Sequence, residues 1–166
     1  MIAYLFWHRP GAGVDAARYE ARLAAFHAAL AVPSRAARVR GAPWMAGDGY
    51  LDWYFVPDWT ALGALNRAAV SGAVEGPHAA VAGLAGWGAG GVVALLAGDR
   101  AFQTVWRWLS KPDGMTYAAF AAALPAGGTL WQRQMVLGPQ PEFALAGDGA
   151  EGVRTRHELV CGQATG

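Results

Sequence analysis

The chain is poor in cysteine and in charged residues. Of its 166 residues, 15% are charged and one, Cys161, is a cysteine. A single cysteine can form neither an internal disulfide nor a cysteine-based zinc site. We therefore expect stability to come from a hydrophobic core, and we predict a cytoplasmic protein, because a reducing compartment suits this composition.

The chain also lacks long hydrophobic runs and an excess of either positive or negative charge. The net charge is +1, and the least polar stretch, residues 79–98, is interrupted by six glycines. Each glycine costs about 1 kcal/mol in a helix interior, so this stretch is a poor membrane span. Residues 1–10 lack the basic start and long apolar run of a signal peptide. We expect neither nucleic acid nor a membrane as a partner, and a monomer or homodimer.

Hydrophobic residues make up 54% of the chain, which predicts a sizeable core. Residues 2–8, IAYLFWH, are typical of a strand. Residues 15–31 carry an apolar stripe with helical spacing and end before Pro33. Residues 35–45 and 50–56, separated by a Gly-Asp-Gly turn, predict a hairpin.

The next segment predicts a helix from Asp58, interrupted by residues 72–76 and followed by a short helix that opens at Pro77. The glycine-rich residues 88–91 read as a linker before a strand at 92–97. They do not match a dinucleotide fingerprint, which should follow a strand and open a helix.

The pattern then restarts. Strands are predicted at 102–110, 129–137 and 142–145, with a helix at 116–124, and a last strand is expected within 153–161. YLFWHRPG followed by YEARLAAFHAAL corresponds in order and character to VWRWLSKPDG followed by YAAFAAAL. We therefore predict an internal duplication, with one repeat at 1–99 and a shortened repeat at 100–166, together one unit.

A strand–helix–strand–strand–helix–strand unit is the ferredoxin-like motif. The sequence thus predicts an α+β fold of two fused ferredoxin-like repeats with antiparallel sheets, and it resembles the dimeric α/β-barrel superfamily. That superfamily includes cofactor-free monooxygenases, cyclase-like proteins and haem-binding members. The resemblance implies a closed barrel with a ligand inside, and roles for His78, which follows Pro77, and for His8 on the first strand.

Strand alternation places Tyr4, Phe6 and His8 on one face. Likewise Asp52 and Tyr54 share a face, opposite the more apolar Leu51, Trp53 and Phe55. We expect the apolar set to meet the helices and the polar set to line the barrel interior. The predicted ligand-binding residues are Tyr4, Phe6, Arg40, Tyr54, Trp106, Trp108 and Arg133.

His8, His78 and Asp52 are the candidate catalytic residues. Imidazole titrates near neutral pH, so either histidine suits a general base, and Asp52 could orient one of them. The alternatives are a structural role for each histidine and an Asp52–Arg40 ion pair. Tyr54 could donate to an oxyanion or simply pack as an aromatic ring.

The four histidines show no metal spacing, and His27 is expected to be structural. No metal or cofactor is predicted. The favoured function is binding of a small apolar or aromatic molecule, with a cofactor-free monooxygenase-like or cyclase-like reaction as one form of it. The alternative is a non-catalytic interaction or structural protein with a packed interior.

Overall fold

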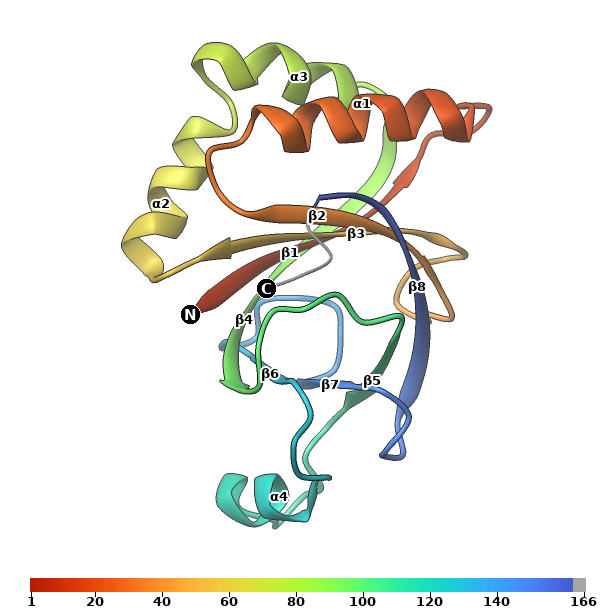
Figure 1. Cartoon of the computed structure of the whole chain (residues 1–166). Helices are drawn as coiled ribbons and strands as arrows, with labels where there is room; N and C mark the ends of the chain where they lie inside the picture. Colours follow the sequence, from red (N-terminus) through yellow and green to blue (C-terminus); the bar gives the residue numbers. More distant parts are fainter. Residues whose placement is uncertain (163–166) are drawn as a thin grey trace.

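The computed structural model describes residues 1–162, which form strands and helices in the order shown in Figure 1. Eight strands and four helices lie within these residues. Their bounds are β1 Ile2–Pro10, α1 Ala16–Ala29, β2 Ser34–Arg40, β3 Gly49–Val56, α2 Trp59–Ala68, α3 Gly72–Ala82, β4 Ala85–Ala97, β5 Val105–Leu109, α4 Tyr117–Ala123, β6 Leu130–Arg133, β7 Phe143–Ala146 and β8 Val153–Gly162.

All the strands join one closed antiparallel barrel, in the order β1-β3-β2-β8-β5-β7-β6-β4. The prediction of two fused ferredoxin-like repeats, and with it the dimeric α/β-barrel fold, is therefore wrong. β2 pairs with β8, and β4 pairs with β6, so hydrogen bonds run around a single sheet without a break. Local patterns identify strands, but lateral partners depend on contacts between distant segments. The division at residue 99 stays a prediction.

Several predicted elements are confirmed. The α1 helix starts where the Asp15 side chain accepts a hydrogen bond from the Arg18 N–H, at 2.8 Å. Such a cap stabilises a helix by about 1 kcal/mol. The β2–β3 hairpin, the α4 helix and the last strand also form as expected. Among residues 1–162, no helix is both long enough and apolar enough to cross a membrane.

Two glycine-rich segments differ from the prediction. Residues 72–76 do not interrupt a helix but open α3, so Pro77 lies inside that helix rather than in its first turn. Residues 88–91 are not a linker either; they belong to β4, which pairs with β1. In β4, pairing with β1 overrides the weak strand preference of glycine.

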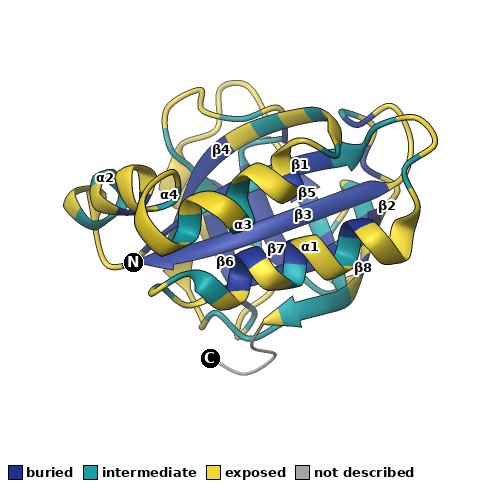
Figure 2. Ribbon diagram, turned by 90° about the horizontal axis from the view of Figure 1, so that it is seen from above, coloured by how far each residue is buried: buried dark blue, intermediate teal, exposed yellow. Residues whose placement is uncertain are grey.

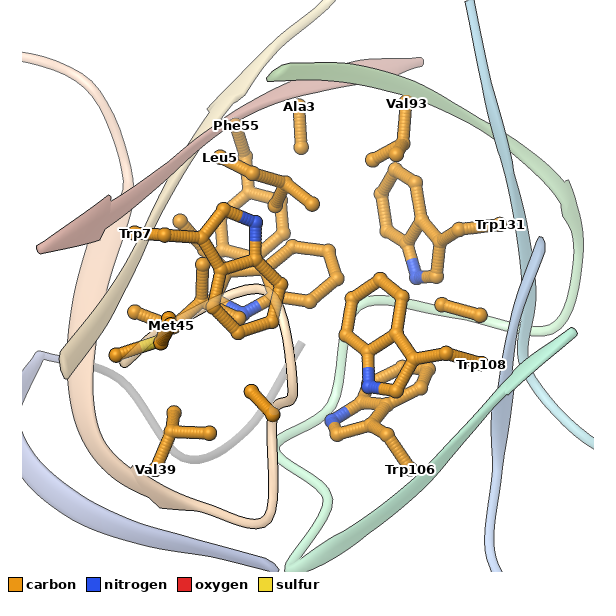
Figure 3. Close-up of a cluster of buried hydrophobic side chains, with 14 residues drawn as sticks. Ala3, Leu5, Trp7, Val39, Met45, Phe55, Val93, Trp106, Trp108 and Trp131 are labelled. Carbon is orange, nitrogen blue, oxygen red and sulfur yellow. The ribbon is translucent and has the colours of Figure 1, made fainter. Parts of the chain in front are cut away.

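The barrel interior is filled by large apolar side chains (Figure 3). Trp53, Trp106 and Trp108 are almost fully buried there, and the Trp53 and Trp106 rings stack with centroids 5.4 Å apart. The residues of this interior cluster are Ala3, Leu5, Trp7, Val39, Ala42, Met45, Leu51, Trp53, Phe55, Val93, Trp106, Trp108, Trp131 and Ala144. The apolar set of β3 therefore points inward, which reverses the predicted orientation.

The α1 and α3 helices lie over the outer face of the barrel wall at β3 (Figure 2). A second core forms between this wall and the helices, and it includes Tyr19, Leu23 and Phe26 of α1. From β3, Tyr50 and Tyr54 join the same core. The face that carries the polar side chains of β1 and β3 is thus buried beneath helices rather than inside the barrel.

Candidate functional site

A cavity of about 690 Å³ lies between the barrel wall and the helices α1, α2 and α3. Its floor comes from β1, β3 and β4, and its lining is mainly apolar. The residues that line it are Tyr4, Phe6, His8, Tyr19, Leu23, Phe26, Asp52, Tyr54, Trp59, Leu62, Gly63, Leu65, Asn66, Ala69, Val70, His78, Val81, Ala82, Ala85, Val92 and Leu137. This size and lining are typical of sites for small, partly apolar ligands.

A histidine–aspartate pair lies at the floor of this cavity. Nε2 of His8 is 3.0 Å from Oδ1 of Asp52, and both side chains are nearly inaccessible to solvent. An ionised carboxylate can only accept hydrogen bonds, so Nε2 carries a proton. Nδ1 of His8 lies 2.6 Å from the hydroxyl of Tyr19 on α1. The three side chains thus form a continuous hydrogen-bonded chain.

Two further residues surround the Asp52 carboxylate. The Tyr54 hydroxyl donates to Oδ2 at 2.7 Å, and Nε2 of His27 lies 3.5 Å from Oδ1, too far for a strong hydrogen bond. Burial opposes ionisation of Asp52, but the electrostatic attraction of His8 and His27, together with the hydrogen bond from His8, outweighs it and holds the pKa of Asp52 well below its usual range. The carboxylate therefore remains ionised at neutral pH.

The tyrosines around this carboxylate remain protonated. Burial, with a smaller contribution from the Asp52 charge, raises the pKa values of Tyr19 and Tyr54 well above the usual range. At the outer end of the cluster, Tyr50 stacks on His8 with ring centroids 5.5 Å apart. Burial and a hydrogen bond to Glu20 raise the pKa of Tyr50 to about 12. Each phenol thus acts as a neutral hydrogen-bonding group.

Glycines in β4 set the position of the aromatic floor. A Cβ atom at Gly88 would lie 2.5 Å from Cζ of Phe6, and one at Gly90 would overlap the ring and hydroxyl of Tyr4. These close approaches need residues without side chains. The Phe6 ring in turn stacks against His8, with centroids 5.3 Å apart. The glycine-rich strand therefore holds two cavity-lining rings in place.

Two of the predicted site residues line the cavity without a hydrogen-bond partner among residues 1–162. The Tyr4 hydroxyl is one, and the His78 ring, which packs edge-on against Phe26 at 5.4 Å, is the other. Asn66 of α2 also lines the cavity. These groups are free to meet polar atoms of a ligand.

The structure brings together His8, Asp52, Tyr54, Tyr4, Phe6 and His78, all of which were predicted from the sequence. Four predicted binding residues lie elsewhere. Trp106 and Trp108 fill the barrel interior, because their strand face points inward. Arg40 is exposed and pairs with Asp48 rather than with Asp52, and Arg133 donates to the backbone carbonyl of Gln140 at 2.6 Å.

Sequence reasoning missed the roles of Tyr19 and His27. Tyr19 was assigned only to an apolar stripe, and His27 was expected to be structural. His27 lies eight residues after Tyr19, which places both on the same helix face, so this spacing was the available signal. In the structure Nδ1 of His27 is 2.8 Å from the Ser34 hydroxyl, while its Nε2 faces Asp52.

Within residues 1–162, no three His, Cys, Asp or Glu side chains are grouped so that they could hold a metal ion. Comparison of the chain with known protein families, with curated proteins and with solved structures finds no match. The case for function therefore depends on the geometry of the cavity.

Proposed function

We propose that this protein binds a small, largely apolar or aromatic molecule in the cavity between the barrel and its helices, and that His8 and Asp52 transfer a proton to or from it. The observation that carries the proposal is a buried, ionised carboxylate hydrogen-bonded to a histidine at the floor of a mainly apolar cavity. Buried charges of this kind are costly, and they are concentrated at functional sites.

Proton removal is the chemistry that this arrangement supports. Asp52 holds His8 by its Nε2–H and stabilises the imidazolium that forms when His8 accepts a proton at Nδ1. Removal of a proton is an initial step for either reaction class predicted from the sequence, a cofactor-free oxygenation or a cyclisation. Apolar walls strengthen this electrostatic stabilisation by keeping water away.

Binding to the cavity is tested with naphthalene as a probe, by equilibrium dialysis. Ala82 lines the cavity at the end of α3, whereas Ala80, also exposed on α3, does not. We expect naphthalene to bind the wild type and Ala80→Trp alike, and to bind Ala82→Trp at least about tenfold more weakly, because the indole occupies part of the cavity. Failure of naphthalene to bind the wild type would contradict the proposal.

One observation favours the alternative of a non-catalytic structural protein. The barrel interior is packed with large apolar side chains, as that alternative predicts. A purely structural role does not explain the cavity outside the barrel or the buried polar cluster at the floor of that cavity, however. The dialysis experiment distinguishes the two functions, since in a purely structural protein the Ala82→Trp substitution would not change the binding of naphthalene.

A further inference from the structure

The hydroxyl hydrogens of Tyr19 and Tyr54 are used within the hydrogen-bonded network at the cavity floor and do not point into the cavity. The Tyr54 hydroxyl must donate to Oδ2 of Asp52, because an ionised carboxylate offers only lone pairs. His8 uses its Nε2–H for Oδ1 of the same carboxylate. In a neutral His8, Nδ1 is then an acceptor, and it receives the Tyr19 hydroxyl hydrogen across 2.6 Å.

Both phenol oxygens therefore present lone pairs to the cavity that they line. His8 and Asp52 have their polar atoms occupied by this network, so neither has a hydrogen to offer a ligand. The atoms of this network that face the cavity are acceptors, and the free donors of the lining, the Tyr4 hydroxyl and the His78 ring, lie outside the network. A ligand carbonyl or ether oxygen would face the lone pairs of Tyr19 and Tyr54 and form no hydrogen bond with them. A ligand hydroxyl could donate a hydrogen bond to the Tyr19 oxygen and so extend the hydrogen-bonded chain of Tyr19, His8 and Asp52.

We propose that the ligand carries a weakly acidic hydroxyl, a phenol or an enol, which docks on Tyr19 and loses its proton to His8 through it. This inference rests on the proposed function. In the step, the ligand O–H bond breaks and its proton moves to the Tyr19 oxygen, while the Tyr19 proton moves to Nδ1 of His8. The products are a ligand oxyanion, a neutral tyrosine and an imidazolium.

The charges support this direction of transfer. The new imidazolium lies against the ionised Asp52, at 3.0 Å, so the pair is neutral overall. Tyr19 now donates its remaining hydrogen to the ligand oxyanion and stabilises it. The lining within residues 1–162 contains no Lys or Arg, so nothing in it favours a ligand that enters as an anion. The favoured ligand enters neutral and is ionised in place.

The test uses 2-naphthol, 2-methoxynaphthalene and naphthalene, which share one ring system. Only 2-naphthol can donate a hydrogen bond. We expect the wild type to bind 2-naphthol about three- to tenfold more tightly than 2-methoxynaphthalene, the range set by one net hydrogen bond. We also expect the absorption of bound 2-naphthol to show naphtholate at a pH where the free compound is neutral.

Tyr19→Phe keeps the ring and removes the hydroxyl. We expect this variant to lose both the preference for 2-naphthol and the naphtholate absorption, and to keep its affinity for naphthalene. Tyr117→Phe removes the hydroxyl of an exposed tyrosine on α4, remote from the cavity, and should behave as the wild type.

Equal binding of 2-naphthol and 2-methoxynaphthalene by the wild type would overturn the inference without any variant. Binding of naphthalene with no naphtholate signal would also overturn it, while leaving the proposed function standing. If none of the three compounds binds, the proposed function fails and the inference fails with it.

Discussion

His8 and Asp52 are diagonal neighbours across the β1–β3 pair. Asp52 faces Phe6 in the register and His8 faces Tyr50, yet Nε2 of His8 and Oδ1 of Asp52 are 3.0 Å apart. Diagonal positions in an antiparallel pair are within reach of long side chains. The contact therefore depends on the register of β1 and β3. It holds the charged carboxylate of Asp52 on the face of the wall that the helices cover.

Asp52→Asn tests the contribution of that charge to stability. The folded-state pKa of Asp52 is lowered from 3.8, so the carboxylate stabilises the fold above pH 3.8, and this contribution is lost as the pH falls below that value. We expect the variant to be less stable at pH 7 by roughly 1–3 kcal/mol in urea unfolding. Its deficit should shrink between pH 4 and 2.5. A deficit that is constant with pH would be inconsistent with this assignment.

His157 should make the protein sensitive to mild acid. Burial and the nearby Arg35 lower the pKa of His157 from 6.5 to about 3. Between these values the unfolded chain binds a proton that the folded chain does not, so stability decreases as the pH falls from 6.5 toward 3. We expect the wild type to lose roughly 3 kcal/mol between pH 7 and pH 4 through this residue.

His157→Phe should remove most of this pH dependence. Urea unfolding of the variant and the wild type at pH 7 and pH 4 measures it. The same loss of stability in both proteins would show that another group is responsible.

Gly90→Ala should reshape the cavity. The added Cβ overlaps the Tyr4 ring, which must then move into the space that the ligand occupies. We expect naphthalene affinity to fall about three- to tenfold, equivalent to roughly 1 kcal/mol. Adding Tyr4→Ala to the same chain should relieve the overlap and restore binding. Gly76→Ala, in open space on α3, is the control and should bind naphthalene normally.

Trp108→Phe should change stability without changing binding. The Trp108 indole N–H donates to the Thr155 hydroxyl at 2.8 Å inside the barrel, on the opposite side of the wall from the cavity. We expect a loss of roughly 2 kcal/mol, from the hydrogen bond and the smaller ring. The naphthalene affinity of the folded protein should equal that of the wild type, whereas Phe6→Leu, at the cavity floor, should weaken it.

Much of the local structure could be predicted from the sequence. The helical spacing from Tyr19 to Phe26 and the capping Asp15 indicate α1 because they depend on residues within a few turns of one another. Strand alternation likewise groups Tyr4 with Phe6 and His8. The glycine-rich first part of β4, residues 85–91, could not be predicted in this way, since its glycines form a strand only beneath the rings of another strand.

The sequence alone determined which side chains share a strand face, because the period of a strand is two residues and needs no partner. Only the tertiary structure decided which face is inside. A closed barrel must fill its interior with its bulkiest apolar residues, and here those are Trp7, Trp53, Trp106, Trp108 and Trp131. Because the two faces of a strand point in opposite directions, the face with His8 and Asp52 points outward, where α1 and α3 cover it and enclose the cavity.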